Sequence, residues 1–253
     1  MGDVRIIRKV LTIANGDIVA IGIDPSLNGS AIAVLVNGVV QKVQGWTDKV
    51  TVQKSYPEFI HWFKLPAKSG FSERQYRVQV MTEWIVQQVG THLSSGAQVY
   101  VSIEGYAHSK RSIRLSDIHE LCGIVKQSMW SMGAPFRIYD PKTLKMAWAT
   151  GNADKHEMMK ACADLFGYDY RALGENPGSN LADAFLLAQL LWVEIQVKLG
   201  MVSISELTPN LQKILTRTTP ASPQSLLNIP FISKQTLVGL ENPVRPAILG
   251  SDI

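Results

Sequence analysis

The sequence predicts an α/β protein built on a mixed β-sheet with helices on both faces. Short apolar runs typical of strands come first, and longer segments with apolar residues at helical spacing follow in alternation with further strands. The first three strands are joined by short turns, so we expect them to pair antiparallel, and we expect the later strands to run parallel. Apolar residues make up 46% of the 253 residues, which is enough for one large core.

The first three strands are expected at residues 18–24, 31–36 and 39–44. The first is apolar without interruption until Asp24, which predicts burial on both faces of the sheet. Residues 25–30 supply a turn, and Asn37-Gly38 is a strong signal for a two-residue hairpin. A carboxylate at the end of such a strand is costly to bury unless a partner such as a divalent metal ion stabilises it.

The remaining elements follow from spacing and from turn residues. Helices are expected at 72–93, 115–132, 141–150, 155–166 and 180–199, and strands at 99–104 and 136–139. Pro141 fits the first position of its helix. Residues 46–70 carry aromatic side chains without a clear period, and residues 174–179 are expected to form a loop.

The chain divides into a short N-terminal segment (1–17), one domain (18–199) and an extension (200–253). Half of the twelve prolines lie in the extension, which predicts a segment that packs on the core or on a partner rather than an independent domain. No stretch is apolar enough for a signal peptide or a membrane span. The two cysteines form no metal-binding pair, so we expect buried free thiols and a cytoplasmic protein, nucleoid-associated in a prokaryotic cell or in a virus-infected host cell.

Three acids end or interrupt apolar elements: Asp24, Glu104 and Asp183. Each acid also has an ordinary alternative role: Asp24 as a turn cap, Glu104 as a salt-bridge partner, and Asp183 as a residue that interacts with the helix dipole in a first turn. Together they predict converging carboxylates that repel one another unless cations neutralise them, and oxygen ligands suit Mg²⁺ or Mn²⁺. The net charge of +4 permits a nucleic-acid partner without demonstrating one.

The segments around these acids carry a family resemblance. Gly22-Ile-Asp24-Pro-Ser-Leu-Asn-Gly-Ser, Val101-Ser-Ile-Glu104 and Asn180-Leu-Ala-Asp183-Ala are similar in type and order to the acidic motifs of RuvC-type Holliday-junction resolvases. Residues 139–155, with Lys145 and Lys155, resemble their strand-to-helix region. The resemblance spans about residues 18–195 and implies an RNase H-like fold of the retroviral integrase superfamily.

The resemblance also implies an activity, which is Mg²⁺-dependent hydrolysis of phosphodiesters in four-way DNA junctions, leaving 5′-phosphate and 3′-hydroxyl ends. By this resemblance Asp24, Glu104, Asn180 and Asp183 hold Mg²⁺, with Mn²⁺ able to substitute, and Lys155 stabilises developing charge. Asn180 departs from the family, which commonly has an aspartate there. An amide oxygen ligates a hard cation without supplying charge.

The predicted DNA contacts are Tyr106, His108, Lys110, Arg111, Arg114, Lys145 and Lys155. The expected partners are branched DNA and a second copy of the chain, since a junction is roughly two-fold symmetric, and the helix after Leu115 is a candidate for part of the dimer face. No membrane partner is expected.

Three alternatives remain open from the sequence. One is another RNase H-like nuclease, acting on RNA–DNA hybrids or on other branched DNA. A second is a non-catalytic junction-binding or assembly protein on the same fold, which Asn180 favours. The third is a sugar-kinase-like ATPase, whose further phosphate-binding glycine motifs are not found in this sequence.

Overall fold

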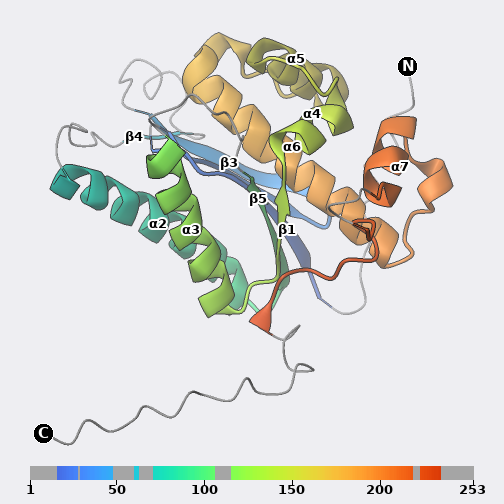
Figure 1. Cartoon of the computed structure of the whole chain (residues 1–253), viewed down its shortest axis with the longest axis horizontal. Helices are drawn as coiled ribbons and strands as arrows, with labels where there is room; N and C mark the ends of the chain where they lie inside the picture. The colour runs from blue at the N-terminus through green and yellow to red at the C-terminus, as the bar shows by residue number, and fades with distance from the viewer. Residues whose placement is uncertain are drawn as a thin grey trace, which may run out of the picture.

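The central layer of the protein is a six-stranded mixed sheet, seen in a computed structural model that describes residues 16–27, 29–47, 60–62, 71–105, 115–218 and 223–234 (Figure 1). The strand order is β4-β3-β2-β1-β5-β6. The strands are β1 (Ile18–Asp24), β2 (Ala31–Val36), β3 (Val39–Thr47), β4 (Ile60–Trp62), β5 (Gln98–Glu104) and β6 (Phe136–Tyr139). β1, β2 and β3 pair antiparallel, whereas β5 runs parallel to β1 and β6 parallel to β5. The predicted α/β class, a mixed sheet with three antiparallel strands followed by parallel ones, is confirmed.

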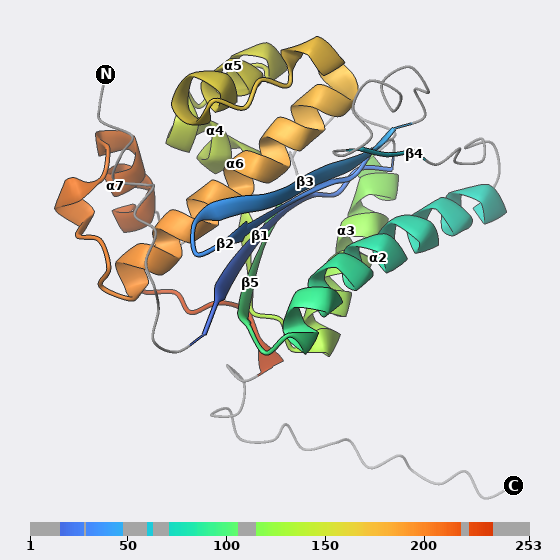
Figure 2. The same ribbon diagram turned by 180° about the vertical axis from the view of Figure 1, so that it is seen from behind.

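Helices cover both faces of this sheet, as Figures 1 and 2 show from opposite sides. α2 (Phe71–Ser94) and α3 (Leu115–Met132) lie on one face. The other face carries α4 (Pro141–Trp148), α5 (Lys155–Phe166) and the long α6 (Glu175–Lys198). Alternate residues of β1 enter the two cores, which explains the uninterrupted apolar run.

α6 crosses β1 at Gly22, and this crossing brings two of the predicted acids together. A Cβ atom at Gly22 would lie 2.1 Å from the carbonyl oxygen of Ala184 and 2.5 Å from the amide nitrogen of Ala188. Only glycine therefore allows the helix backbone to approach the strand this closely. Asp183 stands next to Ala184, so the same approach carries it toward the end of β1.

The predicted hairpin turn at Asn37-Gly38 is also confirmed. Both residues have positive φ angles, 50° at Asn37 and 80° at Gly38. This is the backbone that a two-residue type I′ turn requires. The Asn37 side chain accepts a hydrogen bond from the amide of Ile18 at 2.9 Å, which ties the turn to the start of β1.

Several boundaries differ from those predicted. β3 extends to Thr47 and pairs with β4 in the region where no period was visible. α4 ends at Trp148, because Ala149 has a non-helical φ of −146°. α6 begins at Glu175 rather than 180, with a break at Asn176 and regular helix from Pro177 onward. Asp183 is therefore in the second turn of regular helix, and its expected place in the first turn, with the dipole argument attached to it, was wrong.

Beyond α6 the chain turns back over the same core. It forms two short helices, η3 (Ile204–Glu206) and α7 (Pro209–Thr216). Another 3₁₀ helix, η2 (Arg171–Leu173), lies before α6 in the chain. Leu211, Ile214 and Leu215 of α7 are buried in the core that α6 also enters. This part of the extension is thus packed on the domain.

α6 is the one helix of the described residues that is long and apolar enough to cross a membrane by length and composition alone. Of its most apolar window, 83% is buried inside the protein, which is the arrangement of a core helix. Cys122 and Cys162 are free and buried, as predicted.

Candidate functional site

The site is built where two neighbouring parallel strands end. Ile23 of β1 is in register with Ile103 of β5, so Asp24 and Glu104 leave the same edge of the sheet side by side. Asp183 comes from α6, which crosses β1 at Gly22, two residues before Asp24. Asp24 is buried, and the other two acids are partly exposed.

The three carboxyl groups interact strongly. Burial raises the pKa of Asp24 to about 6, although a hydrogen bond with Glu104 and the charge of Lys155 oppose this rise. Burial and the charges of Asp24 and Asp183 raise the pKa of Glu104 well above its usual range, with Lys145 opposing. Burial and the charge of Asp24 raise the pKa of Asp183 to about 7, again against the two lysines. The cluster therefore cannot hold three full negative charges at neutral pH without a cation.

The carboxyl groups of Asp24 and Glu104 also interact directly. Asp24 and Glu104 are joined by a side-chain hydrogen bond that favours the protonated form of Glu104 and the ionised form of Asp24. Two carboxyl groups form such a bond only when one of them is protonated.

Two lysines flank the acids. Lys145 lies on α4, and its charge lowers the pKa of Glu104 and Asp183. Lys155 is the first residue of α5, where Asp154 and Glu157 form a capping box that fixes the start of the helix. Its ammonium group pairs with Glu175 at 2.8 Å, and both side chains are more than half exposed. The structure thus brings both predicted lysines to the acids, and their roles stay predictions.

Asn180 lies at the edge of the cluster but faces a backbone group. Its Nδ2 donates a hydrogen bond to the carbonyl oxygen of Gly29 at 2.6 Å. Its Oδ1 is 3.4 Å from the hydroxyl of Ser179, which is a weak contact. Sequence reasoning assigned a metal ligand here and did not anticipate the bond to the turn after β1.

The donor chemistry of the cluster fits a hard divalent cation, because every candidate ligand is an oxygen and the acids lack charge compensation. The side chains do not form a ready ligand set, however. Within the described ranges, no three His, Cys, Asp or Glu side chains are grouped as a metal ion would require. Asp24 and Glu104 interact with each other by a side-chain hydrogen bond rather than facing a common metal position. The Mg²⁺ assignment therefore stays a prediction.

The other predicted DNA contacts cannot be placed. Tyr106, His108, Lys110, Arg111 and Arg114 fall in residues 106–114, which lie outside the described part of the chain. Only Gly105, at the start of this segment, is described, and its amide donates to the carbonyl oxygen of Tyr139 at 2.7 Å.

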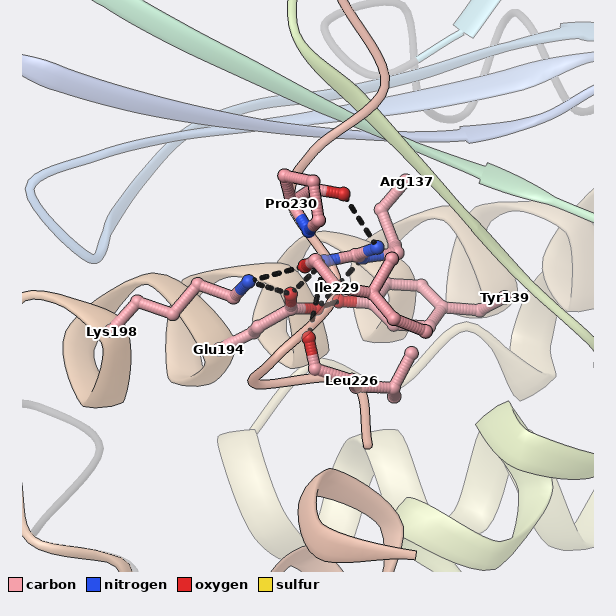
Figure 3. A network of polar contacts seen from close by, with 7 residues as sticks. All are labelled: Arg137, Tyr139, Glu194, Lys198, Leu226, Ile229 and Pro230. Atoms are coloured by element: carbon pink, nitrogen blue, oxygen red, sulfur yellow. Dashed lines mark hydrogen bonds and ion pairs between the residues drawn. The ribbon is translucent and has the colours of Figure 1, made fainter. Parts of the chain in front are cut away.

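A second buried polar cluster was missed from the sequence (Figure 3). Arg137 of β6 forms a buried ion pair with Glu194 of α6, which also accepts a hydrogen bond from the hydroxyl of Tyr139 at 2.6 Å. Lys198, one helical turn further along α6, lies 3.4 Å from the same carboxylate. The sequence offered one signal for this cluster, which is a single charged residue within each of two apolar runs: Arg137 in residues 136–139 and Glu194 in residues 190–195.

The same arginine holds the C-terminal strap, defined here as residues 223–234. Its guanidinium group donates to the carbonyl oxygens of Leu226, Ile229 and Pro230 at 3.3, 2.8 and 3.2 Å. Lys198 donates to the carbonyl oxygen of Ile229 at 2.7 Å, and the ring of Phe231 lies 4.8 Å from the Arg137 guanidinium carbon. Every charge in this cluster therefore has a partner supplied by the protein.

Comparisons with known proteins give a distant likeness. Two solved structures from Thermus thermophilus, one of RuvC and one of RuvC in complex with Holliday junction substrate, are 17% and 16% identical to this chain. Each likeness has a TM-score of 0.47 and covers 72% of this chain and 96% of the other. No family model and no curated protein matches. The likeness is too distant to assign an activity.

Proposed function

We propose that this protein is a metal-dependent endonuclease that cleaves four-way DNA junctions by phosphodiester hydrolysis. The observation that carries the proposal is the meeting of Asp24, Glu104 and Asp183 at one edge of the sheet with two lysines beside them. Strongly perturbed carboxylates grouped without enough protein cations are typical of functional sites. The order and type of the sequence motifs give the substrate class.

The three acids and Asn180 are the candidate ligands for Mg²⁺, with Mn²⁺ able to substitute. When bound, the metal supplies positive charge that activates water and stabilises the leaving oxygen of the phosphodiester. Burial and the neighbouring acids raise the pKa of Glu104, so a cation that binds both Glu104 and Asp24 is expected to displace a proton. Metal binding is therefore expected to release protons near neutral pH.

Lys155 is suited to contact the phosphate group under attack. It begins α5 beside the acids, and more than half of its side chain is exposed. Its pairing with Glu175 is also exposed, so a phosphate oxygen can compete for the ammonium group at small cost. Lys145 on α4 also acts on Asp183 by its charge, and it is suited to position the same DNA strand. The basic residues Lys110 and Arg111 follow Glu104 in the sequence and are candidates for further phosphate contacts.

A homodimer would present two such sites to a roughly two-fold symmetric junction. Its candidate face is the outer surface of α2 and α3. Ile124 is 39% exposed there, between two hollows that the two helices line with Val86, Met132, Val78 and Thr82 among others. An exposed apolar side chain between two shallow hollows is suited to self-complementary packing.

Two other functions stay candidates. A non-catalytic junction binder is favoured by Asn180, which supplies no charge and has its amide nitrogen engaged with Gly29. A nuclease of the same fold acting on RNA–DNA hybrids or other branched DNA would use the same acids.

A cleavage assay separates these possibilities. Synthetic four-way junctions, flaps, linear duplex and RNA–DNA hybrid are each incubated with Mg²⁺, with Mn²⁺ or with a chelator. We expect cleavage of the four-way junction only with a divalent cation, and none by the Asp24→Asn variant. Tight junction binding with no cleavage under any condition would establish the non-catalytic alternative. Faster cleavage of the hybrid would establish the other nuclease class.

A further inference from the structure

The turn between β1 and β2 directly follows Asp24 and is closed by its own side chains. The amide of Ser26 donates to the hydroxyl of Ser30 at 2.9 Å, and this hydroxyl donates back to the carbonyl oxygen of Ser26 at 2.8 Å. The amide of Gly29 donates to the same carbonyl at 3.3 Å. The path of the chain just after the first acid is thus set by a compact hydrogen-bonded turn.

Three other elements hold this turn by its remaining backbone groups. Arg77 of α2, which is buried, donates from Nη1 to the carbonyl oxygen of Leu27 at 2.8 Å. The amide of Trp46 in β3 donates to the carbonyl oxygen of Ser30 at 2.9 Å. Asn180 of α6 donates to the carbonyl oxygen of Gly29 at 2.6 Å. Asn180 is therefore the link between this turn and the helix that carries Asp183.

Neighbouring groups leave no room for a side chain at Gly29. A Cβ atom there would lie 2.7 Å from the carbonyl oxygen of Trp46, 3.1 Å from Oδ1 of Asn176 and 3.3 Å from Nδ2 of Asn180. The amide nitrogen of Asn180 thus packs directly against the carbonyl oxygen of Gly29. A carboxylate oxygen in place of this nitrogen would face the carbonyl oxygen, and neither atom could donate a hydrogen bond.

We propose that Asn180 is a positioning residue, which acts by donating its amide hydrogen to the β1–β2 turn and so fixes Asp24 relative to Asp183. The inference rests on the proposed nuclease function, and it gives this position a role that an aspartate cannot fill. A carboxylate has no hydrogen to donate at neutral pH. It would also add negative charge beside acids whose charges already repel.

The test compares three purified variants with the parent protein. Asn180→Asp removes the donor and adds charge, and Asn180→Ala removes the donor alone. Asn210→Asp is the matched control, because Asn210 is exposed on α7 and also donates its amide to a backbone carbonyl, that of Ala149 at 3.5 Å. The measurements are amide hydrogen exchange of residues 26–30 without metal, calorimetric titration with Mg²⁺ alone, and kcat and KM for junction cleavage.

We expect Asn180→Asp and Asn180→Ala to speed exchange in the turn by about tenfold, as loss of one buried hydrogen bond allows. Both should lower kcat by about tenfold or more without a matching change in KM, because Asp24 is displaced rather than substrate binding lost. Asn180→Asp should not bind Mg²⁺ more tightly than the parent. Asn210→Asp should leave all three measurements unchanged.

One pattern would overturn the inference. If Asn180→Asp tightens Mg²⁺ binding about tenfold or more and leaves exchange in the turn unchanged, Asn180 is only a ligand position that lacks charge. The exchange measurement needs neither metal nor substrate. It therefore decides the role of Asn180 even if the parent protein cleaves nothing, in which case the proposed function fails separately.

Discussion

The two polar clusters of this protein both take residues from α6, Asp183 in one and Glu194 in the other, and they treat negative charge in opposite ways. Around Glu194, an arginine, a lysine and a tyrosine hydroxyl all point at one carboxylate, and the strap carbonyls accept the remaining arginine hydrogens. Around Asp24, three carboxyl groups share two lysines, one of which is largely exposed and pairs elsewhere.

This contrast separates a structural role from a functional one. A buried charge that the protein itself neutralises stabilises one packing arrangement, and removing a partner is costly. A group of acids that the protein leaves under-compensated lowers stability unless something from outside binds. We therefore expect mutations in the two clusters to move activity and stability in different directions.

The largest expected effect is on cleavage, from Asp24→Asn. This change should reduce the rate of junction cleavage by at least about a thousandfold, because it removes the proposed metal ligand at the end of β1. Junction binding, measured by fluorescence anisotropy in Ca²⁺, should stay within about threefold of the parent. Retained turnover would refute the metal assignment.

The next effect is on stability, from Arg137→Ala. It leaves Glu194 buried with its main partner gone and frees three strap carbonyls, so the free energy of unfolding should fall by about 3–5 kcal/mol. Urea unfolding followed by circular dichroism measures this. Arg171→Ala, which breaks the exposed ion pair with Asp169, is the control and should have little effect. Equal losses in the two variants would mean that the strap network contributes no special stability.

Asp183→Asn should raise the stability of the metal-free protein at high pH. The pKa of Asp183 is about 7 in the folded protein and 3.8 in its ordinary state, so the folded state keeps a proton that the unfolded state loses. Its contribution to stability is thus full below pH 3.8 and is lost as the pH rises toward 7.

At pH 8 we accordingly expect the Tm of the Asp183→Asn variant to exceed that of the parent by about 5 °C, with no difference near pH 4. Thermal scans with a chelator at both pH values measure this. Mg²⁺ should then raise the Tm of the parent more than that of the variant. A lower Tm for the variant at pH 8 would show that the carboxylates are already compensated without metal.

The smallest effect is expected from Lys198→Met, which keeps most of the apolar stem and removes the ammonium group. Its bond to Ile229 and its contact with Phe231 are lost, while Arg137 keeps both Glu194 and the strap in place. The free energy of unfolding should fall by about 1 kcal/mol in urea titrations. A loss as large as that of Arg137→Ala would make the lysine, rather than the arginine, the centre of the cluster.

Much of the fold followed from the sequence because the strands and helices carry clear periods. Asp24 and Glu104 were visible as single acids at the ends of apolar runs, and the parallel pairing of their strands then brought them together. β4 was missed because three residues are too few to establish a period.

The side-chain partnerships were not predictable in the same way. The bond from Asn180 to Gly29 joins residues 151 positions apart, and Arg137 meets Glu194 across 57 positions. Such pairs depend on how α6 lies across the sheet, which is set by the small residues at the crossing rather than by any local pattern. A single charge in an apolar run signals that a partner exists without identifying it.

The strap has one further consequence, which concerns the outer border of the sheet. β6 is the last strand, and its Phe136 exchanges two backbone hydrogen bonds with Ile232, both at 2.9 Å. An uncovered border strand offers its peptide groups to any extended polypeptide, including another molecule of the same kind. A shortened version that stops at residue 222 would expose this border, and we expect it to self-associate into β-rich aggregates at concentrations where the whole chain stays dispersed.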